Sequence, residues 1–283
     1  MEPIRLRDVL TVLEGMYPPE EAQSWDRVGL VTGDPDQPVR RVHAAVDPTL
    51  EVIEEARAAG ADLLITHHPL LLRGVHSVAT TSAKGASVTS LVVSDIALFV
   101  AHTNADVAEP GVNTALARAC GLVGTEPLRI EEGRAMGRVG DLPEEVDLEG
   151  FAERLAAALP AAPGGIRVAG PPGGRVRRVA LLGGAGDGLI DAARASDADV
   201  YVTSDLRHHP ALEAREEADA PFLVDAGHWA TESLWLDHML TRLGNHLAER
   251  GADMVGWETH VSTICTDPWT FTVGARTAQG DPQ

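Results

Sequence analysis

The segment Ala61-Asp62-Leu63-Leu64-Ile65-Thr66-His67-His68 joins a short apolar run to two adjacent histidines. The apolar run predicts a buried strand that ends where the histidines begin. Upstream, the pattern predicts a strand over 39–46 and a helix over 50–59, with Gly60 after it. Downstream, it predicts a strand over 96–101 that leads to His102, and a helix over 113–120. A parallel βαβ arrangement, and hence an α/β fold class, follows from this order.

The second half of the chain repeats this plan. Ala198-Asp199-Val200-Tyr201-Val202-Thr203 matches the first segment as far as its threonine. Around it, the pattern predicts a strand over 176–182, a glycine turn over 183–186, a helix over 189–195 and a strand over 199–203. The apolar run 222–224 leads to His228, much as 98–101 leads to His102. Self-similarity over so long a period indicates duplication of a whole α/β unit.

Flanking patterns set the expected boundaries. Apolar residues at helical spacing over 6–16 predict an opening amphipathic helix that stops at Pro18-Pro19. The proline- and glycine-rich stretch 159–175 predicts a linker, and the polar stretch from Ala275 predicts a frayed tail. The expected units are therefore a first repeat over 1–127, a second over 128–250, and a C-terminal segment with a tail over 251–283.

Composition narrows the classes of function. With 23 Lys+Arg against 42 Asp+Glu among 283 residues, the net charge of -19 argues against non-specific nucleic-acid binding. A small anionic substrate stays possible, because bound metal ions can override the overall field. The two cysteines, Cys120 and Cys265, form neither a disulfide framework nor a thiolate zinc motif. Without a signal sequence or a membrane-spanning run, we expect a cytoplasmic protein with no membrane contact.

Metal-binding residue types follow three of the expected strands. Two histidine–acid pairs are spaced i, i+4, which places both side chains on one helical face. The carboxyl ends of strands in an open α/β sheet meet in one crevice, so these groups can converge there. Four imidazoles and two carboxylates suit two divalent ions, with zinc, iron, manganese, cobalt and nickel all open. The expected ligands are His67, His68, His102, Asp106, His228 and Glu232.

Each signal has a simpler explanation when it stands alone. Adjacent strand residues such as His67 and His68 normally point to opposite faces, and a histidine four residues before an acid is often a solvated helical pair. His208-His209 shows that adjacent histidines recur without obvious ligation. The glycines over 183–188 lack the features of a phosphate-binding P-loop, so a tight turn is the simpler explanation. The coincidence of three strand ends, two of them equivalent in the repeat, favours a metal site.

Longer motifs support the same interpretation. They are Ser24-Trp25-Asp26-Arg27-Val28-Gly29-Leu30, Thr66-His67-His68-Pro69-Leu70, His102-Thr103-Asn104-Ala105-Asp106 with Gly111-Val112-Asn113, Thr203-Ser204-Asp205 with His209, and Asp225-Ala226-Gly227-His228-Trp229-Ala230-Thr231-Glu232. With these motifs the chain resembles the Nif-three-like dinuclear-metal family, also known as GTP cyclohydrolase 1 type 2 homologues. Ala105, Trp229 and Ser204 depart from the residues usual there, but no ligand is lost.

The resemblance implies more than the spacing does. It implies two intertwined α/β repeats with mixed, mostly parallel sheets, the same six metal ligands, and a ring-shaped homohexamer. For activity, it implies hydrolysis of a nucleotide, with opening of the guanine ring of GTP and release of formate. His209 or Asp205 would then move protons, and orientation of a ligand is an equal alternative for His209. Two other functions stay open: a metal-storage or metal-delivery protein without turnover, and an interaction partner of regulatory machinery.

Overall fold

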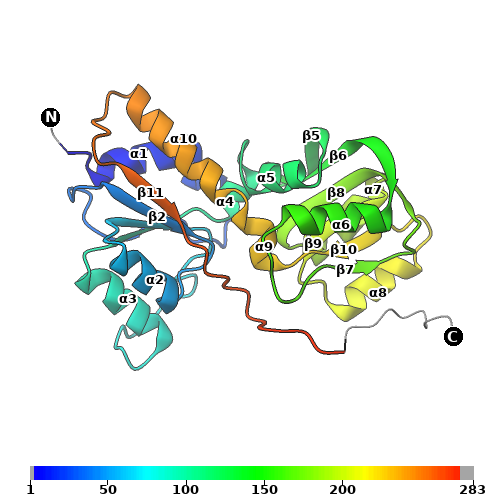
Figure 1. Cartoon of the computed structure of the whole chain (residues 1–283), viewed down its shortest axis with the longest axis horizontal. Coiled ribbons are helices and arrows are strands. Elements are labelled where there is room, and N and C mark those ends of the chain that lie inside the picture. Colours follow the sequence, from blue (N-terminus) through cyan, green and yellow to red (C-terminus); the bar gives the residue numbers. More distant parts are fainter. Residues whose placement is uncertain (1–2, 275–283) are drawn as a thin grey trace.

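The computed structural model describes residues 3–274, which form two lobes joined by a helical junction (Figure 1). The first lobe is built on a five-stranded sheet of order β1-β4-β3-β2-β11. β4, β3, β2 and β11 run parallel, and β1 pairs with β4 in the antiparallel sense. Its strands are β1 (Gly29–Thr32), β2 (Arg41–Ala45), β3 (Leu63–Thr66), β4 (Ala97–Val100) and β11 (Glu258–Val261).

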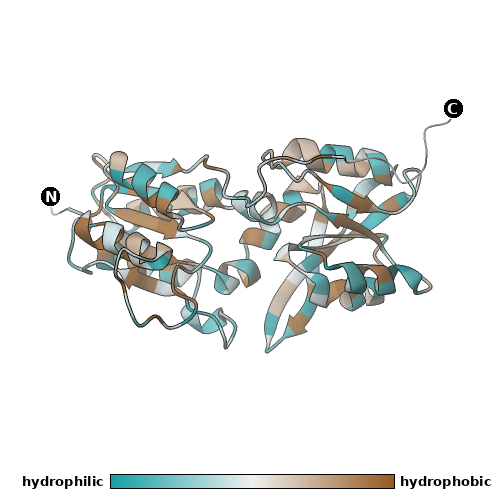
Figure 2. Ribbon diagram, turned by 90° about the horizontal axis from the view of Figure 1, so that it is seen from below, coloured by the Kyte–Doolittle hydropathy of each residue, from teal (hydrophilic) through white to brown (hydrophobic). Residues whose placement is uncertain are grey.

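Helices cover both faces of this first sheet. α1 (Leu6–Met16) has the predicted bounds and buries its apolar stripe on one face, where α10 (Leu236–Glu249) packs beside it. α2 (Leu50–Ala58) and α3 (Ala83–Val93) pack on the opposite face. Because both faces are covered, the central strands are apolar along their whole length, and they are coloured brown in Figure 2.

The second lobe is built on a six-stranded mixed sheet of order β5-β6-β8-β9-β10-β7. β8, β9 and β10 run parallel, whereas β5, β6 and β7 are joined to the sheet by antiparallel pairing. The strands are β5 (Val123–Glu131), β6 (Arg134–Asp147), β7 (Arg167–Ala169), β8 (Arg175–Ala185), β9 (Val200–Ser204) and β10 (Phe222–Asp225). The helices are α6 (Leu148–Ala158), α7 (Ile190–Ala195) and α8 (His208–Glu216), with a short 3-10 turn, η2 (Asp187–Leu189), before α7.

The junction between the lobes consists of helices that directly follow strand ends. α4 (Thr103–Val107) follows β4, α5 (Val112–Ala119) comes next along the chain, and α9 (His228–Ser233) follows β10. After α9 the chain returns to the first lobe as α10, and β11 then pairs with β2 (Figure 1). The two α/β halves are therefore intertwined, as the resemblance implied.

The structure differs from two local predictions, which concern the end of a strand and a linker. The strand expected to end at Leu182 continues as β8 to Ala185, so Gly183 and Gly184 lie within the strand and form no turn. The expected linker 159–175 contains the short edge strand β7, which pairs with β10. The frayed tail expected from Ala275 lies outside the described residues.

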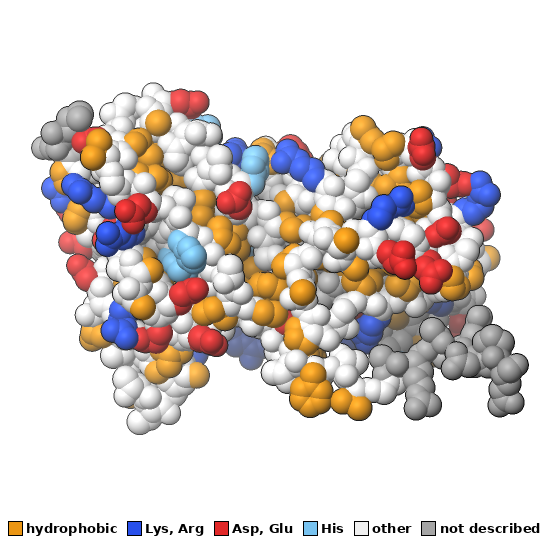
Figure 3. Space-filling model, in the orientation of Figure 1, with side chains coloured by type: hydrophobic (Ala, Val, Ile, Leu, Met, Phe, Trp, Pro, Cys, Tyr) orange, Lys and Arg blue, Asp and Glu red, His pale blue; other side chains and the backbone are white. Residues whose placement is uncertain are grey.

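Two surface features bear on the expected partners. Among residues 3–274, no helix is long and apolar enough to cross a membrane. On the face drawn in Figure 3, Lys and Arg side chains are interspersed with Asp and Glu. That face therefore presents mixed charge and no continuous basic surface of the kind that binds nucleic acid non-specifically.

Candidate metal centre

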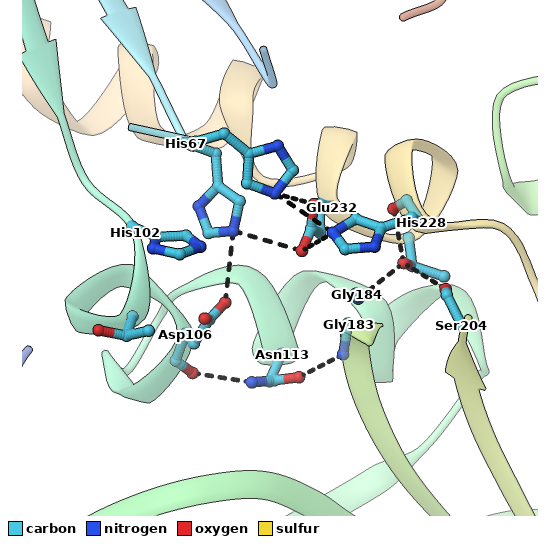
Figure 4. A network of polar contacts seen from close by, with 12 residues as sticks. His67, His102, Asp106, Asn113, Gly183, Gly184, Ser204, His228 and Glu232 are labelled. Carbon is cyan, nitrogen blue, oxygen red and sulfur yellow. Dashed lines mark hydrogen bonds and ion pairs between the residues drawn. The ribbon is translucent and has the colours of Figure 1, made fainter. Parts of the chain in front are cut away.

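The junction brings together all six side chains that the strand-end pattern singled out. All of them except His68 are labelled in Figure 4. His67 and His68 directly follow β3, and His102 caps the start of α4, which also carries Asp106. His228 and Glu232 lie one turn apart on α9, as their spacing predicted. Both halves of the chain therefore contribute to one cluster.

Glu232 lies at the centre of this cluster. Its Oε1 atom is 3.5 Å from His67 Nε2 and 3.2 Å from His228 Nε2. Its Oε2 atom is 3.0 Å from His68 Nε2. Asp106 approaches from the other side, with Oδ1 3.7 Å from His67 Nε2. The two carboxylates thus flank His67, and Glu232 links both halves of the chain.

All four imidazoles are oriented in the same way. Each ring uses Nδ1 to contact an oxygen outside the cluster and directs Nε2 inward. The partners of Nδ1 are the Ala101 carbonyl oxygen for His67 at 2.9 Å, Asp47 for His68 at 2.7 Å, Asp26 for His102 at 2.9 Å, and Asp205 for His228 at 2.7 Å. When Nδ1 carries the proton that it donates, Nε2 is left with a free lone pair.

Several inward atoms lack a hydrogen-bond partner within the described part of the chain. They are the buried atoms His67 Nε2, Asp106 Oδ1 and Glu232 Oε2. His68 Nε2 lies 3.0 Å from Glu232 Oε2, but the two atoms are not aligned for a hydrogen bond. His68 Nε2 and His228 Nε2 also lie only 3.2 Å apart. Buried acceptors that converge without donors are unfavourable unless a cation or protons neutralise them. The donor set and its geometry therefore fit metal ions.

Without a cation, protons would take this place. Burial lowers the pKa of His68, but Glu232 and Asp47 outweigh it and raise the pKa to about 10. Burial also lowers the pKa of His228, but Glu232 outweighs this effect and raises the pKa to about 9. For Glu232, burial raises the pKa but the surrounding histidines hold it well below its usual range. The cluster therefore has strong affinity for positive charge, whether protons or a metal cation supply it.

Two glycines of β8 make room for the second-half ligands. Gly184 adopts a φ of +71°, and a Cβ atom there would lie 2.2 Å from Glu232 Oε1. The Gly183 amide donates to Asn113 Oδ1 at 2.9 Å, and the Gly184 amide donates to Thr231 Oγ1 at 3.0 Å. The glycine run therefore positions α9 against the cluster, a role different from the predicted turn.

The simpler explanation for the adjacent histidines does not hold. β3 ends at Thr66, so the pleat that would direct His67 and His68 to opposite faces does not continue. Their ring centroids are 5.1 Å apart, and both Nε2 atoms approach Glu232. Convergence at a strand end thus overrides strand alternation.

The two residues predicted to move protons lie in different places. Asp205 follows β9 and accepts the hydrogen bond from His228 Nδ1. His209 is exposed on α8, and no hydrogen bond or ion pair within 3–274 joins it to the six clustered residues. The structure brings only Asp205 to the cluster.

Sequence reasoning missed two orienting carboxylates. Asp47 comes two residues after β2, so the strand-end rule that singled out the ligands also points to it. Asp26 accepts hydrogen bonds from His102 Nδ1, the Thr103 amide and the Thr103 hydroxyl, which hold its pKa well below the usual range although burial opposes the shift. Asp26 belongs to the first motif of the resemblance but follows no strand.

Two cavities open onto the cluster. One, of about 390 Å³, is lined by five of the six residues together with Trp25 and Arg129. The Trp25 ring packs edge-on against His102, with centroids 5.9 Å apart. The other, of about 660 Å³, is lined by His68, His228 and the segment after β11. The cluster is thus buried but reachable by small molecules.

Comparisons with known proteins identify the family of this chain. The family described as Duf34/NIF3 (NGG1p interacting factor 3) matches residues 4–268. The chain belongs to the DUF34/NIF3 family. A curated DUF34/NIF3 relative from Streptomyces coelicolor, called GTP cyclohydrolase 1 type 2 homolog, is 49% identical, with 96% of this chain and 95% of the relative covered. A relative of the same name from Mycobacterium tuberculosis is 35% identical, with 95% and 97% covered.

Solved structures of the DUF34/NIF3 family share the fold. The structure of the Bacillus cereus protein related to NIF3 superimposes with a TM-score of 0.88 at 27% identity. It covers 96% of this chain and 100% of that protein. Both lobes and the junction that carries the histidine cluster therefore belong to the family architecture.

Proposed function

We propose that this DUF34/NIF3 protein is a dinuclear metal-dependent hydrolase that acts on a nucleotide or a related small molecule. The observation that carries the proposal is the inward orientation of four Nε2 atoms around two buried carboxylates. Within residues 3–274, three of these inward atoms, His67 Nε2, Asp106 Oδ1 and Glu232 Oε2, lack hydrogen-bond partners. Two overlapping ligand groups support two ions. They are His67 with His68 and His102, and His68 with His228 and Glu232.

When bound, the two ions would polarise a substrate oxygen and activate water for attack. The protein's own contribution is to hold Nδ1 of three imidazoles on Asp26, Asp47 and Asp205, so that each Nε2 faces the position of the ions. In the smaller cavity, Trp25 provides an aromatic wall and Arg129 a cation. An aromatic ring and an anionic group on the substrate suit these two side chains.

The printed names of the relatives motivate GTP as the first substrate to test. The experiment measures metal per chain and formate release from GTP for the wild type and His68→Ala. We expect two ions in the wild type, fewer in the variant, and loss of turnover with the lost metal. His246→Ala, on the exposed face of α10, is the matched histidine control.

The outcomes separate hydrolase from storage. Metal that binds to the wild type without turnover of any nucleotide would favour the metal-storage or metal-delivery alternative. Turnover that survives in metal-free protein would contradict a metal-dependent hydrolase. A proton-transfer role for Asp205 or His209 stays within this proposal, and kinetics of Asp205→Asn and His209→Ala test it.

The ring-shaped homohexamer is also part of the proposal. Light scattering should give a mass six times the 29.9 kDa of one chain. A monomer at micromolar concentration would contradict this assembly. The predicted cytoplasmic location stays a prediction, tested by fractionation of cells.

A further inference from the structure

A second group of metal-ligand side chains lies away from the cluster just described. It consists of His43 on β2, Glu55 on α2 and His260 on β11. His43 is four residues before Asp47, the residue that contacts His68 in the first cluster. Four residues of extended backbone span roughly 13 Å. The two groups are therefore separate sites, and this inference does not depend on the proposed hydrolase function.

Strand register brings the two histidines together. β11 pairs in parallel with β2, and His260 is the direct partner of His43 (Figure 1). Residues in register on neighbouring strands project from the same face of a sheet. The two ring centroids are consequently 4.7 Å apart. α2 covers this face of the sheet and presents Glu55 to both rings.

Glu55 directs one oxygen to each histidine. Oε2 is 2.9 Å from His43 Nε2, and Oε1 is 3.9 Å from His260 Nε2. Around a tetrahedral zinc ion with bonds of about 2.0–2.1 Å, ligand atoms lie roughly 3.3–3.4 Å from one another. One ligand atom from each of the three residues already lies within 4.8 Å of the other two, so side-chain rotations would complete the coordination.

We propose that His43, Glu55 and His260 form an open divalent-metal site, best suited to zinc. Two imidazoles and a carboxylate are a known zinc ligand set that leaves one coordination position free. The protonation states agree: burial lowers the pKa of His43 despite Glu55, so the ring is neutral near pH 7. The Glu55 carboxylate is ionised, because hydrogen bonds from Ser262 and His43 lower its pKa against the effect of burial.

The site has an entry path and a structural consequence. The His260 side chain is 55% exposed, whereas His43 is 1% exposed, so an ion can enter from the solvent side. β11 is a short edge strand, and a metal ion there would fasten it to β2 and α2. The segment after β11 reaches Asp47 through the Thr266 hydroxyl. The ion would thus hold the C-terminal segment against the sheet.

A metal count with matched variants tests the site. Zinc is titrated into metal-free full-length protein in the presence of a competing chelator, for the wild type, His260→Ala, Glu55→Gln and His246→Ala. We expect His260→Ala and Glu55→Gln each to bind one zinc ion fewer than the wild type. His246→Ala removes an exposed histidine paired only with Glu249, so its count should equal the wild type.

Glu55→Gln separates a ligand from a merely structural residue. The glutamine side chain still accepts a hydrogen bond from His43 but loses the negative charge that strengthens zinc binding. Substituted cobalt gives a second readout, since both site variants should lose part of its visible absorption. Equal zinc and cobalt binding by the wild type and both variants would overturn the site. Loss of metal only in His68→Ala would do the same and leave the proposed hydrolase standing.

Discussion

The two halves of the molecule contribute to the candidate metal centre in different ways. The first half supplies His67, His68, His102 and Asp106 from two adjacent strand ends of one sheet. The second half supplies only His228 and Glu232, from a single turn of α9. Yet Glu232 approaches three of the four histidines, whereas Asp106 approaches His67 alone among the recorded ion pairs of the described chain. The first half therefore forms most of the ligand shell, and the second half closes it.

The largest effect should come from Glu232→Gln. Glutamine keeps the shape but removes the charge that faces three histidines, so we expect loss of bound metal and of metal-dependent turnover. The metal-free protein should also lose about 3–5 kcal/mol of stability, the usual effect of removing one partner from a buried ion cluster. Metal analysis and urea unfolding measure both quantities.

Asp106→Asn is the matched comparison from the first half. It removes a carboxylate that lies 3.7 Å from one histidine, so part of the metal should remain. Equal losses of bound metal in Glu232→Gln and Asp106→Asn would show that the second-half carboxylate is no more important than the first-half carboxylate.

Gly184→Ala should have the next largest effect. Its Cβ atom would lie 2.2 Å from Glu232 Oε1, at a backbone φ of +71° that favours glycine. We expect displacement of Glu232, loss of metal, and a stability loss of about 1–3 kcal/mol from overpacking.

Gly188→Ala is the matched control, because nothing lies within 4 Å of a Cβ atom there. Metal content and thermal unfolding are measured for both variants. If Gly184→Ala binds as much metal as Gly188→Ala, the glycine run does not position the second-half ligands.

Comparison of the halves also shows why the sequence predicted the clustered residues better than the carboxylates that orient them. All six clustered residues follow strand ends or lie in a helical turn after one, so local patterns were sufficient to find them. Asp26 could not be found this way, since its hydrogen bonds to His102 and Thr103 join positions far apart in the chain. The role of Gly184 likewise depends on its distance from Glu232, which composition does not encode.

The fold shows the same limit. The βαβ order of the first half was predictable from apolar runs and the glycine after α2. The pairing of β11 with β2 was not, because an exposed edge strand carries no apolar pattern of its own. β7 was hidden by the prolines and glycines around it, since an edge strand tolerates such neighbours. Both edge strands are therefore defined by pairing with residues far away in the sequence, which local patterns do not reveal.

A smaller effect should distinguish the orienting carboxylates of the two halves. Asp47 holds His68 and has a side chain 28% exposed, whereas Asp205 holds His228 and is 59% exposed. Loss of such a support usually weakens metal binding by about 10–100-fold. We expect Asp47→Asn to reach that range and Asp205→Asn to fall below it, because water can replace the more exposed partner.

Zinc competition with a chelator measures both affinities. Asn tolerates the positive φ of +56° at position 205, so that variant should fold normally. A larger loss in Asp205→Asn than in Asp47→Asn would reverse the assigned importance of the two supports.

The smallest expected effect is a pH dependence that differs between metal-free and metal-loaded protein. Without metal, the pKa values of His68 and His228 are raised to about 10 and about 9. A raised folded-state pKa stabilises the protein fully below the unfolded value of about 6.5, and this stability is lost as pH rises through the folded value. Metal-free protein should therefore unfold at a lower temperature at pH 9 than at pH 6.5. The stabilisation by bound metal should instead increase from pH 6.5 to pH 9, because protons no longer compete for Nε2.

Thermal unfolding at the two pH values, with zinc or with a chelator, measures the difference. We expect the melting temperature gained from zinc to be larger at pH 9 by several degrees, since about 1 kcal/mol corresponds to roughly 2–4 °C in a chain of this size. His68→Ala should reduce the pH dependence of the metal-free protein more than Asp205→Asn, which affects His228. The pKa of His68 is raised further than that of His228, and its ring is less exposed. The same zinc gain at both pH values would mean that protons do not occupy the cluster when metal is absent.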